Sequence, residues 1–312
     1  MNNKLLLLWL LVTSLLLTAG CSDTSDDDWS RDGDDRTNVN RNDTSKEPAL
    51  GRLEFPKVKG GNSMVIIHTT NDSYGINYSV EWDCDKKAPR WSAYQMTHET
   101  MQQNVTRYYS QTNQYPHDPM LPNDLYLSQD CYWNSGFDHG HMCPSYDRLY
   151  SAEANYQTFF LTNMQPQYKA FNGSLSGGES YKNDYSPWYQ MEGARGVVRK
   201  AIGYTNAEVL YVVKGGTIED DQILTKVKGE MRVPKWFFVA LLLKNKEGYK
   251  AAGFWMEHKS SYFEKVSPAD CLVNIRELES LTGIDFFCNL PDDIEERVET
   301  LPVENIKRAW GL

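Results

Sequence analysis

The sequence predicts an α+β fold in which a mainly antiparallel central sheet is flanked by helices. Short runs rich in β-branched and aromatic residues follow one another with few helical patterns between them. Strands that succeed each other in this way usually pair as antiparallel neighbours, whereas alternating strands and helices favour a parallel sheet. About 260 residues follow position 50, which is enough to bury a sizeable core in one large domain.

Each expected element follows from a local pattern. Runs of apolar and β-branched residues predict the strands 63–68, 78–82, 91–96, 158–162, 209–213, 236–243 and 250–256. Pro187 in a first turn predicts a helix over 187–202. Gly215-Gly216 is expected to end the strand 209–213. A second helix is expected over 271–281, stopped by Gly283.

Residues 1–20 are expected to be a signal peptide. A short basic stretch precedes the apolar run 5–17, which is shorter than the about 20 residues that cross a bilayer. The sequence Leu-Thr-Ala-Gly-Cys that ends at Cys21 resembles a bacterial lipobox, although Thr18 stands where Leu is usual. That resemblance implies a lipid chain on Cys21 and a membrane anchor; an ordinary secretory signal is the alternative.

Residues 21–50 are expected to be the lipidated cysteine and a disordered acidic tether, and residues 51–312 one globular domain. The stretch 22–48 is polar and acidic and has too few apolar residues to order its backbone. An acidic run behind a lipidated cysteine resembles the surface-export signals of some bacterial lipoproteins. It implies a protein of the bacterial cell envelope, lipid-anchored to the outer membrane and either surface-exposed or periplasmic.

Charge and cysteines set further limits. The formal net charge of −10 disfavours nucleic-acid binding, so any such site needs a local basic patch and metal ions. An exported chain can form disulfides, and Cys271 with Cys288 is the expected pair because the two flank one predicted helix. Five cysteines follow Cys21, so at least one stays unpaired within the monomer.

The stretch Asp138-His139-Gly140-His141 is the densest cluster of chemically active side chains. Glycine permits a tight backbone path, and a histidine can accept a proton from water near neutral pH. Three interpretations are open on these residues alone. They are a general base on a turn, a zinc site that adds Cys143, and a loop whose histidines are satisfied by hydrogen bonds.

Later motifs resemble those of the DNA/RNA non-specific endonucleases, the ββα-metal or His-Me finger family. That family shows Asp-Arg-Gly-His, then Thr-Asn with Met and Pro-Gln, an Asn nine residues after the first, and Trp-x-x-x-Glu. Here His141 takes the catalytic histidine position, Asn163 and Asn172 match the two asparagines, and Glu192 matches the glutamate. Further similar stretches, which extend the resemblance over about 64–290, are 88–97, 211–218, 233–242 and 275–287.

The resemblance implies a role for each matching residue. His141 would be the general base for water, and Asn172 would bind one hydrated Mg²⁺, with Mn²⁺ or Ca²⁺ as other candidate ions. Glu192 would hold the waters of that ion, and Asn163 would orient the histidine or the phosphate. Arg107 would supply positive charge at the phosphate. Each residue also has an ordinary structural alternative. Asn163 could cap a strand end, and Asn172 could be a turn residue. Glu192 could be a solvated helix residue, and Arg107 could form a surface salt bridge.

Substrate contacts are expected from His139, Arg148 and Arg195, although surface charge explains the two arginines equally well. His139 stands where the family has an arginine, so a fixed positive charge is missing at this position. Fifteen residues, 173–187, separate Asn172 from the tryptophan of the last motif where the family has about three, and this insertion makes Asn183 a rival metal ligand. Asp138 is expected to hold the turn.

The function implied is a metal-dependent, sugar-non-specific endonuclease that hydrolyses DNA and RNA. Two alternatives stay open. The altered Asp-His-Gly-His, the insertion and the acidity favour a degenerate, non-catalytic binding module of the same fold. An envelope phosphodiesterase acting on small nucleotides is the other.

Overall fold

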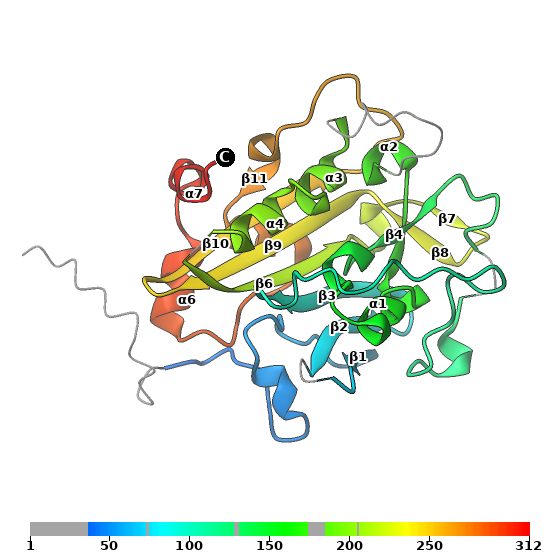
Figure 1. Cartoon of the computed structure of the whole chain (residues 1–312), viewed down its shortest axis with the longest axis horizontal. Helices are drawn as coiled ribbons and strands as arrows, with labels where there is room; N and C mark the ends of the chain where they lie inside the picture. Colours follow the sequence, from blue (N-terminus) through cyan, green and yellow to red (C-terminus); the bar gives the residue numbers. More distant parts are fainter. Residues whose placement is uncertain (1–36, 73–74, 128–130, 174–184, 205) are drawn as a thin grey trace, which may run out of the picture.

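A seven-stranded antiparallel sheet forms the centre of the molecule (Figure 1). The computed structural model describes residues 37–312, apart from 73–74, 128–130, 174–184 and 205. The strands, in spatial order, are β1 (Ser63–Thr69), β2 (Ile76–Asp83), β3 (Ala88–Met96), β6 (Ala207–Gly216), β9 (Trp236–Asn245), β10 (Gly248–Glu257) and β11 (Leu272–Val273). Every neighbouring pair is antiparallel, which confirms the predicted α+β class.

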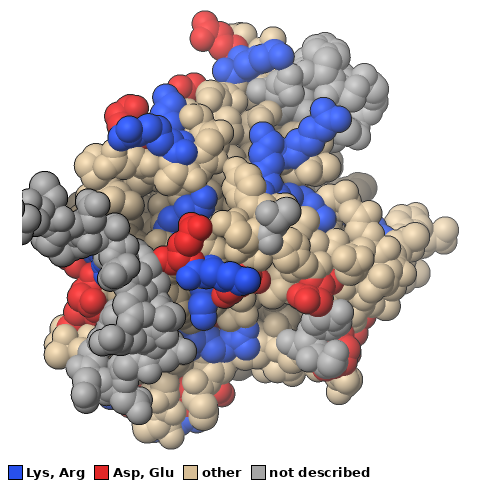
Figure 2. Space-filling model, turned by 60° about the vertical axis from the view of Figure 1, so that its left-hand side comes forward, with Lys and Arg blue, Asp and Glu red and all other residues tan. Residues whose placement is uncertain are grey.

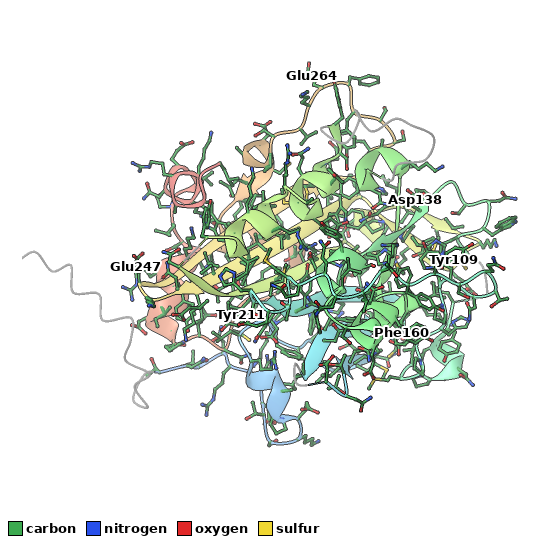
Figure 3. The ribbon with its side chains drawn as sticks, viewed as in Figure 1. Tyr109, Asp138, Phe160, Tyr211, Glu247 and Glu264 are labelled. Atoms are coloured by element: carbon green, nitrogen blue, oxygen red, sulfur yellow. The ribbon has the colours of Figure 1, made fainter. Side chains whose placement is uncertain are left out.

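Helices cover both faces of the sheet, so the molecule has two cores. Successive strand residues point to opposite faces. Val212 and Val239 therefore face one core, and Val213 and Ala240 face the other. Side chains fill the space between the sheet and the helices (Figure 3). The first core is closed by α3 (Pro187–Glu192), α4 (Val197–Ile202) and α7 (Val303–Trp310), and the second by α5 (Ile275–Thr282) and α6 (Asp292–Glu299).

Two two-stranded sheets, of which β7–β8 is a hairpin, and two small helices lie beside the large sheet. β4 (Asp138–His141) pairs with β5 (Met164–Gln167), and α2 (Lys169–Asn172) follows directly, which gives a ββα unit. The second hairpin joins β7 (Ile223–Val227) to β8 (Met231–Pro234). Helix α1 (Ala152–Gln157) stands between β4 and β5 in the chain.

The predicted strand 158–162 is wrong. These residues form turns that lead into a 3-10 helix, Leu161–Asn163. The hydroxyl of Thr158 donates to the carbonyl of Asn155 at 2.7 Å, which closes the end of α1. Phe159 and Phe160 are buried, so this run is apolar because it fills a core and not because it is extended.

Both predicted helices are shorter than expected. The segment 187–202 breaks into α3 and α4, because Gly193 and Gly196 form a tight turn closed by a 2.7 Å backbone hydrogen bond. The helix expected from 271 begins at Ile275, after a 3-10 turn, Pro268–Cys271, and β11. Gly283 does end it, in the left-handed conformation.

The Cys271–Cys288 disulfide is also wrong, since both thiols are free. Cys271 packs against the core under α3, α4 and α7. Cys288 lies at the opposite face, where its sulfur is 3.4 Å from the amide nitrogen of Asn42 and 3.8 Å from the carbonyl oxygen of Phe55. The sheet therefore separates the two cysteines.

The globular part begins before residue 51, which corrects the boundary predicted for the tether. Residues 37–50 pack against the chain that follows α5. Asn42 is buried and donates to the carbonyl of Pro56 at 3.0 Å, and Asn40 donates to carboxylates of Asp285 and Glu295. The sequence predicts disorder for this segment because it has few apolar residues. Hydrogen bonds of its asparagines hold it against the domain instead. Residues 1–36 lie outside the described part of the chain. Among the described residues, no helix is long and apolar enough to span a membrane.

Candidate active site

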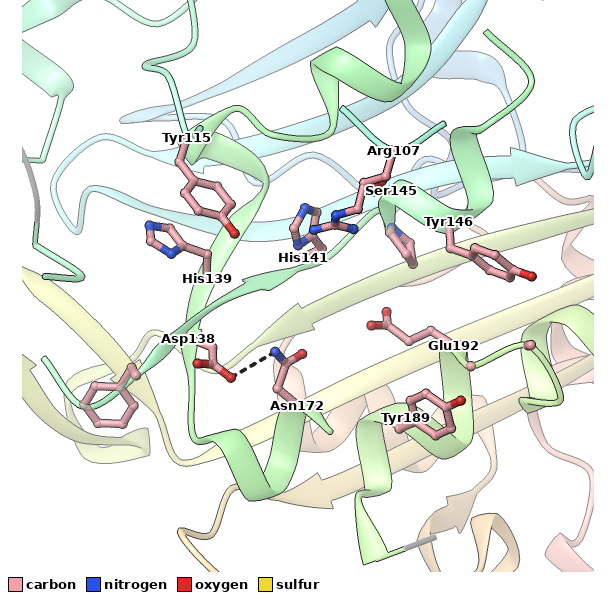
Figure 4. A pocket seen from close by; sticks show the side chains of 14 residues that line it. Arg107, Tyr115, Asp138, His139, His141, Ser145, Tyr146, Asn172, Tyr189 and Glu192 are labelled. Atoms are coloured by element: carbon pink, nitrogen blue, oxygen red, sulfur yellow. Dashed lines mark hydrogen bonds between the residues drawn. The ribbon is translucent and has the colours of Figure 1, made fainter. Parts of the chain in front are cut away.

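A cavity of about 610 Å³ opens where the ββα unit meets α3 (Figure 4). Such a volume is typical of small-molecule and cofactor sites. The residues that line it come from segments far apart in the chain: Arg107, Tyr115, Phe137, Asp138, His139, His141, Pro144, Ser145, Tyr146, Asn172, Tyr189, Glu192, Gly193 and Ala194. Four of the predicted catalytic or metal-binding residues, Arg107, His141, Asn172 and Glu192, therefore share one cavity.

His141 stands at the end of β4, opposite Met164 of β5. Its ring is 8% exposed, and Nε2 has no hydrogen-bond partner among the described residues. Burial holds the pKa of His141 well below its ordinary value, and the charges of Arg107 and His139 lower it further. The imidazole is therefore neutral at pH 7, and it forms part of the cavity wall.

The glycine before it allows β4 to lie close to β5. A Cβ on Gly140 would stand 2.3 Å from the side-chain amide carbon of Gln167, closer than any real contact. Glycine leaves room here for the buried side chain of Gln167, and the backbone at this position needs no left-handed conformation.

His139 lies between two aromatic rings. Its ring stacks on Tyr115 at 3.6 Å between centroids and on Tyr132 at 4.0 Å. Burial lowers the pKa of His139 to about 4, so it is neutral at pH 7. It lines the cavity as predicted for a substrate contact, but it carries no positive charge there.

Asp138 sets the orientation of the Asn172 amide. Asn172 is the last residue of α2, and its Nδ2 donates to Oδ2 of Asp138 at 3.3 Å. Because the amide nitrogen is taken by the carboxylate, the amide oxygen is turned to the other side (Figure 4). The hydrogen bond thus holds a hard oxygen donor in the cavity.

Glu192 faces the same cavity from the end of α3 and forms an ion pair with Lys214. Oε2 of Glu192 lies 3.2 Å from Nζ of Lys214, which is fully buried on β6. The Lys214 ammonium also lies over the rings of Trp188 and Tyr94, at 5.2 and 5.8 Å from their centroids. Burial raises the pKa of Glu192 to about 7, and Lys214 opposes that rise.

Arg107 lies at the open side of the cavity, with its guanidinium 4.7 Å from the ring centroid of Phe159. The side chain is exposed, so it is available to an anion that enters. Its charge already acts on the site, since it lowers the pKa of His141.

Asn163 does not line the cavity. It is fully buried, and its amide clamps the turn after His141. Oδ1 accepts from the backbone nitrogen of Cys143 at 2.8 Å, and Nδ2 donates to the carbonyls of Cys143 and Thr158, each at 2.8 Å. Asn163 can position the strand that carries His141, but it cannot touch a phosphate. Its predicted catalytic role is therefore corrected to a positioning role.

The two other predicted arginines have different environments. Arg148 is buried, stacks on Tyr94 and donates to the carbonyls of Asn77 and Gln95, so its predicted contact with substrate is wrong. Arg195 is exposed in the turn between α3 and α4, beside the lining residue Ala194. Asn183 and Cys21 lie outside the described residues.

Sequence reasoning missed the aromatic walls and the buried cation of the site. Tyr115 and Tyr146 line the cavity, and Lys214 supports Glu192. A lysine inside an apolar strand pattern, as in Tyr-Val-Val-Lys-Gly-Gly, was a visible signal for Lys214. The structure does not support the zinc interpretation. Within the described ranges, no three His, Cys, Asp or Glu residues are arranged to hold a metal ion.

Comparison with known proteins agrees with this geometry. Residues 64–293 match the sequence profile of the DNA/RNA non-specific endonucleases. The chain belongs to this family. Membership makes the protein a nuclease, a hydrolase whose substrates are nucleic acids.

Curated relatives of this endonuclease family are similar over much of their length. A nuclease of Nostoc sp. (strain PCC 7120) is 25% identical over 74% of this chain and 79% of its own. Nuclease C1 of Cunninghamella echinulata is 24% identical over 69% of this chain and 81% of its own. The mitochondrial nuclease EXOG of Xenopus laevis is 25% identical over 70% of this chain, and the match spans 58% of that longer protein.

A solved structure shares the fold. In the crystal structure of the EndoG/EndoGI complex, one chain superposes with a TM-score of 0.57 at 18% identity. The superposition covers 75% of this endonuclease chain and 91% of that chain. The ββα unit and the large antiparallel sheet are thus the architecture of a ββα-metal nuclease.

Proposed function

We propose that the protein is an Mg²⁺-dependent endonuclease that hydrolyses phosphodiester bonds of both DNA and RNA, with His141 as its general base. The observation that supports this most is the His141 ring, which burial keeps neutral at pH 7. It lines one cavity with two oxygen-bearing side chains, Asn172 and Glu192. A base beside oxygen donors suits hydrolysis by an activated water.

The donor set fits a hydrated hard cation. Amide and carboxylate oxygens are preferred by Mg²⁺, and by Mn²⁺ and Ca²⁺, which remain the other candidates. In this proposal Asn172 would bind the ion directly, with its amide oriented by Asp138, and Glu192 would hold water molecules of the ion. Such a cation stabilises the charge that develops on the leaving oxygen.

The chain's own residues supply the remaining steps. The imidazole of His141 takes a proton from the attacking water, which it can do at neutral pH because its pKa is low enough to keep the ring neutral. The exposed guanidinium of Arg107 neutralises charge on the phosphoryl oxygens of the substrate. Asn163 holds the turn behind His141 in place.

The test uses the full-length protein in detergent, incubated with supercoiled plasmid and, separately, with total RNA. Each reaction is run with Mg²⁺ and with EDTA, beside His141→Ala. Metal-dependent degradation of both polymers is expected, and a missing general base should lower the rate by about 10² to 10⁴-fold. Cleavage at the wild-type rate by a folded His141→Ala protein would refute the mechanism.

The rival functions predict other outcomes of the same test. The neutral His139, where the family has an arginine, favours a non-catalytic binding module. That module would bind the polymers but leave both intact over a range of pH and divalent ions. A phosphodiesterase for small nucleotides would hydrolyse a chromogenic phosphodiester and leave the plasmid supercoiled.

We also propose that Cys21 carries a lipid that attaches the enzyme to the outer membrane, with the domain at the cell surface or in the periplasm. The lipobox-like sequence that ends at Cys21 supports this location. Growth with a radiolabelled fatty acid should label the protein and should fail to label Cys21→Ser. Equal labelling of the two proteins would refute the anchor.

A further inference from the structure

We propose that Tyr146 is a stacking platform for a nucleobase at the mouth of the catalytic cavity, and that it makes unpaired nucleotides the preferred substrate. This inference rests on the proposed function, because it names the form of nucleic acid that the same site takes. It concerns a residue five positions after His141 that the hydrolytic steps themselves do not use.

Tyr146 is the exposed member of an otherwise buried 3-10 helix, Ser145–Arg148. Its side chain is 38% exposed, while the other three residues are buried. The same tyrosine lines the cavity with His141 and Glu192. The turn that follows the proposed general base thus presents an aromatic ring to whatever occupies the site.

A buried arginine holds this ring in place. The guanidinium of Arg199 lies over the Tyr146 ring, 4.3 Å from its centroid, and Arg199 is itself 7% exposed. Nη1 of Arg199 donates to Oδ1 of Asp147 at 2.6 Å and to the Tyr146 carbonyl at 3.3 Å. A ring fixed in this way loses little further freedom when a base stacks on it.

The opposite wall and the size of the cavity suit one unstacked nucleotide. Tyr189 and Glu192 of α3 lie across from Tyr146, and His141 and Asn172 lie between them and the stacked Tyr115–His139 pair (Figure 4). A cavity of about 610 Å³ has room for a nucleotide, and the face of a base is open to the Tyr146 ring only when that base is unstacked. A base must therefore leave its duplex to reach Tyr146, which costs least in a single strand.

Stacking on an aromatic side chain works with every base, which is consistent with sugar-non-specific cleavage of any sequence. Its contribution to single-strand binding corresponds to about 5- to 150-fold in affinity per base. A tyrosine that served the fold alone would have the same effect on every substrate. A stacking tyrosine affects only substrates that bring a base.

The experiment compares wild type, Tyr146→Phe and Tyr146→Ala on two labelled single-stranded 12-mers. One 12-mer is natural, and the other has abasic sites on both sides of the labelled linkage. On the natural 12-mer, kcat/KM of Tyr146→Ala should fall by about 10- to 100-fold, and that of Tyr146→Phe should stay within about twofold. On the abasic 12-mer all three proteins should be equally slow. Tyr156→Ala is the matched control, because Tyr156 is also 38% exposed but does not line the cavity.

Two further readouts separate this inference from the proposed function. Wild type should cleave the single strand faster than its duplex, and Tyr146→Ala should lose that preference. Binding of the two 12-mers in EDTA, followed by fluorescence anisotropy, measures stacking even if no cleavage occurs. If neither 12-mer is cleaved but the natural one binds more tightly than the abasic one, the nuclease mechanism is overturned and the stacking role stands. An equal loss on natural and abasic 12-mers, or no loss in Tyr146→Ala, would overturn the stacking role.

Discussion

At the scale of single residues, burial determines the charge of the site. His139 and His141 are held neutral, and burial raises the pKa of Glu192 to about 7. The family resemblance expects a fixed positive charge where His139 stands. In this protein the buried cation beside the carboxylate is Lys214, which approaches from β6 under the cavity.

We expect Lys214 and Glu192 to be strongly coupled. Lys214→Met leaves a largely buried carboxylate without its partner and should lower the free energy of unfolding by about 1 to 3 kcal/mol. Glu192→Gln should relieve much of that loss, so the double variant should be more stable than the sum of the two single effects predicts. Urea unfolding in EDTA measures all four proteins without a bound cation. Additive effects would show that the ion pair contributes nothing.

At the scale of elements, the site depends on how β4 is held. Gly140 lets β4 approach β5, and Asn163 clamps the turn that leaves β4. Asp138 then connects β4 to the end of α2. His141, Asn172 and Tyr146, the proposed general base, metal ligand and stacking platform, all stand on or directly beside this ββα unit.

Asn163→Ala should therefore act through the fold of this unit. It leaves the backbone nitrogen of Cys143 and two buried carbonyls without partners, so the free energy of unfolding should fall by about 2 to 4 kcal/mol. Urea unfolding followed by tryptophan fluorescence measures the loss. Asn113→Ala, in an exposed loop, is the control and should change stability little. A similarly small effect of Asn163→Ala would show that the clamp is not needed.

At the scale of the whole molecule, charge is unevenly distributed. On the face shown in Figure 2, lysine and arginine side chains form patches with acidic side chains between them, despite the net charge of −10. A cluster of acidic residues lies away from the site, around α5 and α6. Burial raises the pKa of Glu299 to about 10 and those of Glu279 and Glu295 to about 7, and Arg276 is the cation that opposes these shifts.

This cluster should make stability depend on pH. A folded-state pKa above the ordinary 4.5 means that the folded protein retains protons that the unfolded chain releases. The stability these protons provide is complete below pH 4.5. It is lost as pH rises, up to about 7 for Glu279 and Glu295 and further for Glu299.

Glu299→Gln removes the largest of these titrations while keeping the shape of the side chain. Its Tm should exceed that of wild type by an amount that grows between pH 5 and pH 9, which differential scanning calorimetry measures. Glu296→Gln is the control, because Glu296 also pairs with Arg276 but is 67% exposed. A Tm difference that stays constant with pH would contradict the burial of a proton at Glu299.

The sequence by itself determined most of the sheet and the family, and it singled out four polar residues that share the cavity. Nearly continuous apolar runs locate strands such as β9 and β10, because both faces of a buried sheet must be apolar. Motif order was enough to single out His141, Asn172 and Glu192. Only the tertiary structure decided what each polar side chain meets. Arg148 and Asn163 donate to buried backbone carbonyls, Lys214 pairs with Glu192, and Tyr115 and Tyr146 line the cavity. Burial and hydrogen-bond partners come from segments distant in the chain, and no local pattern encodes them.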